Sequence, residues 1–410
     1  MVKKNLQGNK LRFVLHGLFY NAGIGISEPS TILPLIVNYF TANNIIIGLL
    51  SSLLRGGSIL TQLYAAFYAQ AYIKVLKYLR IIFIVRFISW FSIGLVLFFF
   101  SSDFPILTLW LFGFFLFAFS FSAGFGTIYF QELMGKLFTP EYRGGVIALR
   151  QILGGIGAIS SGFFAAHILQ NFDKPYSFAY LFLISSLFMA SGYLSAGTVK
   201  EPPKRDLRNR EKNFPDFFKH MIFLLKSNKT LRFQIVSRVL AFSFMFVAPF
   251  IILQAKKQFQ LTGMAIGSFA AIQMTGALVS NFIWGFLSVR NYNIAIVRIA
   301  YMLMIFSLSL AFFVHTFLGY AILFFILGGS IDGIRLAFQN LILIIAPEKE
   351  RPTYIAMQNN VAAIGLFFSI PGGLLINNLG FNFTLSFAIL FLIIGLISSF
   401  GMKTKKHANI

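Results

Sequence analysis

Five ionisable side chains interrupt long apolar stretches of this sequence, and they are the residues best suited to chemistry. They are Glu28, Arg55, Arg238, Asp332 and Arg335. A charge at the centre of a bilayer costs at least about 2.5–3.5 kcal/mol, so such residues persist where they are paired or where they line a water-filled route. Carboxylates can carry protons and guanidinium groups can bind anions, so the pattern predicts a polar site inside a membrane protein.

The first acid and the first arginine of this set are expected at similar depths in consecutive apolar stretches. With a helical rise of about 1.5 Å per residue, Glu28 and Arg55 come close enough to form an ion pair. Two interpretations remain open. In one, protonation of Glu28 releases Arg55 to bind an anionic solute. In the other, the pair is a static bridge between two helices.

Asp332 and Arg335 are three residues apart and therefore share one face of a helix. Either they neutralise each other locally, or Asp332 titrates while Arg335 binds a solute. Arg238 lies near one end of its apolar stretch, and we expect its side chain to snorkel to the membrane surface. The remaining basic side chains near the ends of apolar stretches are interpreted as surface anchors: Arg86, Arg150 and Arg298, with His16 as a lone interfacial histidine.

The composition decides what kind of protein must position these charges. The chain has 410 residues, of which 57% are hydrophobic and 11% charged, which indicates a polytopic membrane protein. The formal net charge of +22 reflects Lys and Arg in the loops of one side, so we expect no binding to nucleic acid. Cysteine is absent, which excludes disulfides and thiol catalysis.

About twelve apolar stretches are long enough to span a bilayer as helices. They cover 11–37, 45–71, 79–100, 104–135, 145–170, 176–198, 231–254, 262–288, 293–314, 317–346, 353–377 and 380–402. We expect an all-α protein with a six-helix half at 1–198, a connection at 199–230 and a second half at 231–410. The alternation of basic loops places both termini in the cytoplasm, and no cleaved signal peptide is expected.

The connection combines two predicted features. Its prolines and mixed charges, beginning at Lys200-Glu201-Pro202-Pro203, predict a flexible cytoplasmic tether. Apolar residues from Phe214 to Leu225 then recur at helical spacing with lysines between them. This pattern predicts an amphipathic helix on the anionic inner leaflet, or the beginning of the seventh span.

One loop occurs twice. Pro140-Glu141-Tyr142-Arg143 is followed 208 residues later, from Arg143 to Arg351, by a second loop of similar sequence beginning Pro347-Glu348. Each copy separates the fourth and fifth apolar stretches of its half. The repeat predicts two related halves with a site where they differ, because Asp332 aligns with Gly124 and Arg335 with Thr127.

This arrangement resembles the major facilitator superfamily, in particular its bacterial members. The family motif after helix 2 is degraded here, since Ala66 and Gln70 replace its Gly and Asp, and the second copy at Gly285–Arg290 also lacks the acid. The resemblance implies that helices 1, 4, 7 and 10 line a cavity. It also implies a cytoplasmic gate, for which the candidates are Glu132, Glu141, Arg143, Glu348, Arg351 and Gly285. Bending is expected at Pro29, Pro34, Pro371 and Gly372.

The function that follows is secondary active transport by alternating access in a bacterial plasma membrane. The excess of buried Arg favours a small anionic or zwitterionic organic solute, with protons as the candidate coupling ion. Efflux of hydrophobic compounds and a transport-inactive membrane scaffold are the alternatives. No phosphate-binding Gly-x-x-x-x-Gly-Lys loop and no metal-ligand cluster occurs, so we expect no enzyme, no cofactor and no metal. We expect a monomer that contacts the lipid bilayer and its solute.

Overall fold

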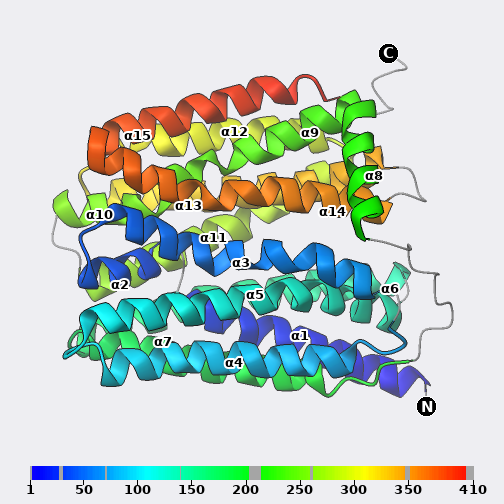
Figure 1. Cartoon of the computed structure of the whole chain (residues 1–410), viewed down its shortest axis with the longest axis horizontal. Coiled ribbons are helices and arrows are strands. Elements are labelled where there is room, and N and C mark those ends of the chain that lie inside the picture. The colour runs from blue at the N-terminus through cyan, green and yellow to red at the C-terminus, as the bar shows by residue number, and fades with distance from the viewer. Residues whose placement is uncertain are drawn as a thin grey trace. The chain divides into compact units, whose positions relative to one another are not determined.

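A computed structural model describes residues 2–26, 31–69, 72–138, 140–202, 214–258, 262–346 and 351–402, and these ranges are almost entirely helical, with no β-strand. Figure 1 shows the helices in chain order. They are α1 (Val2–Ile26), α2 (Ile32–Phe40), α3 (Asn44–Ala69), α4 (Leu76–Phe99), α5 (Pro105–Leu137), α6 (Pro140–Asn171), α7 (Tyr176–Gly197), α8 (Phe214–Ser227), α9 (Lys229–Leu240), α10 (Ala248–Gln258), α11 (Gly263–Val289), α12 (Asn293–Leu310), α13 (Phe317–Ile345), α14 (Arg351–Ala362) and α15 (Ser369–Ser399).

Nine helical segments within the described ranges are long and apolar enough to cross a membrane. One of them, Met357–Ser399, has 43 residues, which is enough for two crossings. Its backbone leaves the helical region at Gly380, where φ is 84° and ψ is 171°. Only glycine adopts this conformation without strain, so Gly380 permits the turn between the last two spans. Together with α1–α2 and α3, these segments account for the twelve expected spans, and the all-α expectation is confirmed.

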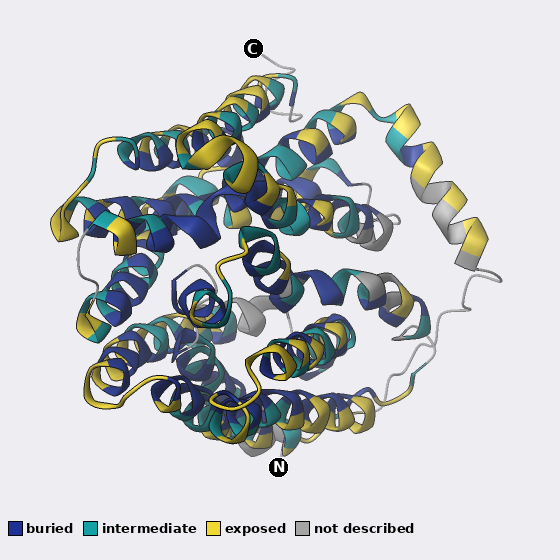
Figure 2. Cartoon of the chain, turned by 60° about the vertical axis from the view of Figure 1, so that its left-hand side comes forward, coloured by how far each residue is buried: buried dark blue, intermediate teal, exposed yellow. Residues whose placement is uncertain are grey.

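The long helices have two different faces. Figure 2 shows buried and exposed residues alternating around most of them. Trp90, Tyr301 and Phe324 are fully buried, whereas Trp110 and Phe282 are among the most exposed large apolar side chains. Exposed apolar side chains of this size suit contact with lipid tails rather than with water.

Two spans of the second half are interrupted by short 3-10 helices, η1 (Ala241–Phe246) and η3 (Ala363–Phe368). A proline follows each of them, Pro249 at the start of α10 and Pro371 in the first turn of α15. Proline lacks the N–H that would bond to the carbonyl four residues earlier, so the preceding turn is free to tighten. The break at Pro371 was expected from the sequence, whereas the break before Pro249 was not.

The first span is described as two helices, and residues 27–30 between them lie outside the described residues. α1 ends at Ile26 and α2 begins at Ile32. Pro34 lies buried in the first turn of α2. Glu28 and Pro29 lie outside the described residues, so their expected roles as a coupling acid and a hinge stay predictions.

The chain forms two compact units that differ from the two halves of the sequence. Unit 1 contains 1–42, 53–210 and 260–271, and unit 2 contains 43–52, 211–259 and 272–410. Unit 1 thus includes the beginning of α11, and unit 2 includes the beginning of α3.

Glycines allow the beginning of α11 in unit 1 and the beginning of α3 in unit 2 to pack close to the backbones of neighbouring helices. In unit 1, a Cβ on Gly267 would lie 2.5 Å from the carbonyl oxygen of Gly162 in α6. In unit 2, a Cβ on Gly48 would lie 2.0 Å from the carbonyl oxygen of Ser369 in α15. The Ser369 hydroxyl also donates to the Gly48 carbonyl at 3.0 Å. Small residues therefore set the helix contacts within each unit, as is typical of membrane proteins.

The first residues of the polar connection are held against unit 1. The Lys200 N–H donates to Asn9 Oδ1 at 3.1 Å, and Asn9 Nδ2 donates to the Lys200 carbonyl at 3.3 Å. The expectation of a tether that is flexible from residue 199 onwards is therefore wrong for these residues, because hydrogen bonds attach them to α1.

α8 is a separate helix, in the position where the sequence predicts an amphipathic one. It ends at Ser227, and the Asn228 side chain accepts a hydrogen bond from the Leu231 N–H, which caps the beginning of α9. Within unit 2, α8 runs across the ends of α9 and α14 (Figure 1). A helix that crosses the ends of membrane spans is suited to lie along a membrane surface.

Candidate substrate site

The candidate site in unit 2 is built around a carboxylate and a guanidinium group on α13. Arg335 Nη2 lies 2.8 Å from Asp332 Oδ1, across one helical turn. The Asp332 side chain is 15% exposed, and the Arg335 side chain is 49% exposed. The ion pair forms where the spacing in the sequence predicts it, and a large part of the arginine remains accessible.

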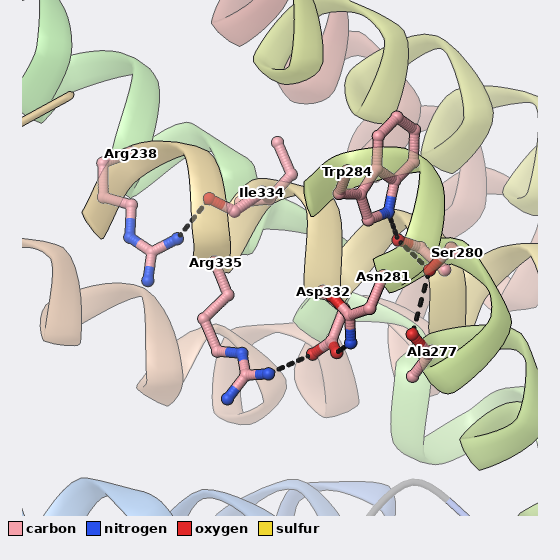
Figure 3. Close-up of polar contacts among 9 residues, drawn as sticks. Arg238, Ala277, Ser280, Asn281, Trp284, Asp332, Ile334 and Arg335 are labelled. Atoms are coloured by element: carbon pink, nitrogen blue, oxygen red, sulfur yellow. Dashed lines mark hydrogen bonds and ion pairs between the residues drawn. The ribbon is translucent and has the colours of Figure 1, made fainter. Parts of the chain in front are cut away.

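The second oxygen of the carboxylate is bound from a neighbouring helix. Asn281 Nδ2 in α11 donates to Asp332 Oδ2 at 2.6 Å (Figure 3). Both oxygens of Asp332 therefore have a hydrogen-bonding partner. This arrangement holds the carboxylate in one orientation, because each of its oxygens has its own donor.

Packing between α11 and α13 decides that Asn281 meets Asp332. Trp284 Nε1 donates to the Gly329 carbonyl at 3.0 Å, one turn before Asp332 (Figure 3). A Cβ on Gly328 would lie 2.0 Å from the carbonyl oxygen of Gln273. The two backbones approach closely here because a glycine stands at the contact, and the short Asn281 side chain can then span the gap.

Arg238 joins the site from α9. Its guanidinium group lies 5.2 Å from the ring centre of Phe242 and 5.3 Å from that of Phe338. Arg238 Nη1 donates to the Ile334 carbonyl at 3.4 Å, next to Arg335 in the sequence. The expectation of a membrane-surface anchor does not agree with these contacts, because the side chain turns toward α13. In Figure 3, Arg238 and Arg335 point in the same direction from their helices.

The repeat-equivalent position in unit 1 carries no charge. Asp332 aligns with Gly124, and a Cβ on Gly124 would lie 2.0 Å from the Thr61 hydroxyl oxygen in α3. Thr61 itself donates to the Phe121 carbonyl at 2.7 Å. The corresponding helices of unit 1 are thus closed by tight packing, whereas those of unit 2 hold a carboxylate between them.

Several other predicted site residues cannot be placed in this site. Glu28, Pro29 and Glu348 lie outside the described residues. The helical positions of a further four are described, but their side chains are not: Arg55, Glu141, Arg143 and Arg351. Glu132 lies partly buried on α5, and Gly285 on α11 has open space where a Cβ would stand.

The hinge candidates of the eleventh span have a packing role. A Cβ on Gly372 would lie 2.1 Å from the Phe246 carbonyl oxygen at the end of η1. A Cβ on Gly373 would likewise lie 2.1 Å from the Asn44 carbonyl oxygen. The Pro371-Gly372-Gly373 segment therefore lies where α15 packs against η1 and α3.

A second carboxylate, that of Glu201, is hydrogen-bonded near the degraded family motif. No sequence pattern predicted these contacts. The Glu201 carboxylate accepts hydrogen bonds from the backbone N–H groups of Val75 and Leu76, each at 2.9 Å, at the beginning of α4. Lys136 at the end of α5 lies 2.8 Å from Glu201 Oε1. Glu201 thus supplies a negative charge to the loop between the second and third spans, where the family acid is replaced by Gln70. A carboxylate at a helix N-terminus is favoured by the unpaired N–H groups there.

Sequence reasoning also missed Asn281 and Trp284. The available signal was their polar groups inside an apolar stretch, since a buried amide or indole N–H requires a partner. Among the described residues, no group of three His, Asp or Glu side chains is arranged to hold a metal ion.

Comparison with known proteins gives a consistent result. The sequence profile of the Major Facilitator Superfamily matches residues 17–370. No curated protein matches the sequence. The fold is similar to that of a D-xylose-proton symporter, with a TM-score of 0.71, 14% identity and coverage of 97% of this chain and 96% of the other.

Two further solved structures share the fold. A point mutant of the nucleoside transporter NupG gives a TM-score of 0.75 at 12% identity, covering 96% of this chain and 99% of that one. A bacterial homologue of the human lysosomal transporter Spinster gives 0.64 at 12% identity, covering 98% and 97%. At these identities, the structural likeness establishes the fold and not the solute.

Proposed function

Because the chain belongs to the Major Facilitator Superfamily, we propose that it is a secondary active transporter of a small organic solute that carries a carboxylate or another anionic group. The family makes it a membrane transporter and not an enzyme. The observation that supports the solute class is the set of polar side chains in unit 2, where Arg335 and Asn281 bind the Asp332 carboxylate and Arg238 donates to the nearby Ile334 carbonyl.

The charge of this set favours an anionic or zwitterionic solute. Arg238 and Arg335 carry two positive charges, and Asp332 offsets one of them. Arg335 is half exposed, so donors beyond its bond to Asp332 remain accessible. A guanidinium group can bind a carboxylate through two parallel hydrogen bonds, which suits Arg335 to an anionic solute.

Asp332 is the proposed coupling acid. Protonation of its carboxylate would remove the charge that holds Arg335 Nη2 at 2.8 Å. The released guanidinium would then be free to bind the anionic group of the solute. This assignment replaces neither Glu28 nor Arg55, whose side chains lie outside the described residues, and it concerns unit 2 alone.

The proposed setting is the plasma membrane of a bacterium, with both termini in the cytoplasm and a monomer as the transporting species. Asymmetric loop charge supports this orientation. The named solutes of two structural neighbours, D-xylose and nucleosides, are small organic molecules, which supports the size class only. Efflux of hydrophobic compounds is less favoured, because the site places three charged side chains in one region.

Counterflow into proteoliposomes tests the proposal. Proteoliposomes that contain the purified protein would be loaded with one unlabelled compound from a panel of carboxylates, amino acids, sugars and nucleosides. Uptake of the same compound in labelled form would then be measured. We expect counterflow with at least one carboxylate or zwitterion, and Asp332→Asn should keep counterflow but lose acceleration by a proton gradient. Transport of neutral or hydrophobic compounds alone would contradict the solute class. No flux with any compound would favour the scaffold alternative.

A further inference from the structure

A second group of basic side chains lies inside unit 1, and the proposed transport site does not include it. Arg86 on α4 is 8% exposed, and His16 on α1 is 4% exposed. Arg150 on α6 packs over Gly17, where an added Cβ would lie 2.3 Å from Arg150 Cγ. The expectation that Arg86 and Arg150 are surface anchors is therefore wrong, because both side chains turn toward the interior of the helix bundle.

Arg86 is surrounded by aromatic rings. Its guanidinium group lies 4.1 Å from the ring centre of Phe119 and 5.9 Å from that of Tyr193. Arg86 Nη2 donates to the Tyr20 hydroxyl at 2.8 Å. The Nε of Arg86 is buried and makes no hydrogen bond.

Arg150 contacts His16 and an aromatic ring. Its Nη2 lies 3.3 Å from His16 Nδ1. Arginine has no acceptor, so His16 Nδ1 must accept this bond and the ring is neutral, with its proton on Nε2. The guanidinium group lies 5.1 Å from the ring centre of Phe130, and its buried Nε also makes no hydrogen bond.

The charges of this cluster are not balanced within the described part of unit 1. Neither arginine forms an ion pair there. Cation–π contacts with neutral rings do not supply the opposite charge that a basic group at membrane depth requires. Two buried donors without partners in one cluster indicate a missing acceptor, either an ordered water or an ion. The positive charges of the two arginines favour the ion.

We propose that Arg86, Arg150, His16 and Tyr20 form an oxyanion-binding site in unit 1, separate from the transport site in unit 2. The ligand would be a phosphate or carboxylate group that accepts hydrogen bonds from the free N–H groups of both arginines. The surrounding rings exclude water and strengthen the charge-assisted bonds. A free anion and the headgroup of an anionic phospholipid share this chemistry, and the experiment separates them.

Thermal unfolding of the purified full-length protein in a neutral detergent provides the first measurement. Inorganic phosphate would be added at constant ionic strength, with chloride as the reference salt. We expect a saturable rise in Tm for the wild type, because a ligand that binds only the folded protein stabilises it. Arg150→Gln should weaken the apparent affinity at least tenfold, and Tyr20→Phe, which keeps both charges, should weaken it less.

Arg298→Gln is the matched control. Arg298 also has a buried Nε without a partner and lies 4.1 Å from the ring centre of Phe400, but its described contacts include no second arginine. This variant should keep the full response to phosphate, as should Asp332→Asn in the transport site. A response in Arg150→Gln equal to that of the wild type would overturn the proposal.

The lipid source is tested on the same proteins by native mass spectrometry after reconstitution in nanodiscs of phosphatidylglycerol and phosphatidylcholine. Retained phosphatidylglycerol that is lost in Arg86→Gln/Arg150→Gln but kept in Arg298→Gln would support the site with a lipid headgroup as its ligand. A phosphate response without retained lipid would support a free anion. Absence of both effects in the wild type would overturn the proposal.

Discussion

Two ion pairs in this molecule have the same length and different surroundings. Lys136 and Glu201 in unit 1 are 2.8 Å apart, with side chains only 10% and 2% exposed. Arg335 and Asp332 in unit 2 are also 2.8 Å apart, but the arginine is 49% exposed. Glu201 additionally accepts two backbone N–H groups, whereas Arg335 retains accessible donors. Distance alone therefore does not distinguish a structural pair from one that is available to a ligand; burial and the remaining donors do.

The largest expected effect is on stability and comes from the buried pair. Glu201→Ala would leave Lys136 and two N–H groups at the beginning of α4 without their acceptor. Removing one member of a buried ion pair costs about 3–5 kcal/mol, so the apparent Tm in detergent should fall clearly. Asp216→Asn is the control, since Asp216 and Lys219 are 4.0 Å apart and mostly exposed. Equal Tm changes in the two variants would contradict the comparison.

The half-exposed pair should behave differently. Arg335→Gln should reduce solute transport at least tenfold and lower Tm less than Glu201→Ala does, because Arg335 is 49% exposed and Asp332 keeps its hydrogen bond from Asn281. Counterflow and thermal unfolding would be measured on the same preparation. Arg290→Gln removes an exposed arginine that lies over Phe286 and should keep transport. A large loss of Tm in Arg335→Gln would show that this pair is structural as well.

Arg238 allows the comparison to be refined within unit 2. Arg238→Lys keeps the positive charge but loses the planar group between Phe242 and Phe338 and the bond to the Ile334 carbonyl. Lysine replaces neither contact fully, so we expect the KM of transport to rise several-fold, about 1 kcal/mol, with the maximal rate nearly unchanged. A KM equal to that of the wild type would remove Arg238 from the solute site.

The smallest effect is expected on α8, where exposed lysines lie beside exposed apolar side chains. On α8, Ile222 is 42% and Phe223 64% exposed, and Lys219 and Lys226 are exposed beside them. The wild type should have a higher Tm in nanodiscs with phosphatidylglycerol than in phosphatidylcholine alone, by a few degrees at most. Ile222→Ser/Phe223→Ser should reduce this difference. An unchanged difference would mean that α8 does not bind the lipid surface.

Local periodicity explains which parts of the fold and site were predictable. The apolar stretches predicted the spans because each must cover the hydrocarbon layer with its own residues. The spacing of Asp332 and Arg335 predicted their ion pair because residues three apart on a helix are neighbours whatever surrounds them. The loop that occurs twice, with Arg143 and Arg351, aligned the two halves. This alignment singled out Asp332 as a charged residue with no charged equivalent in the first half.

Contacts between helices were not predictable in this way. Asn281 meets Asp332 only because glycines let α11 and α13 approach closely, and Glu201 reaches the beginning of α4 only because residues 199–202 fold back onto unit 1. The burial of Arg86 and Arg150 depends on aromatic rings from other helices. The sequence by itself determined the membrane-spanning helices, the repeat and the pair within α13. Only the tertiary structure decided which side chains of different helices meet, because such contacts depend on how closely and at what register two helices pack.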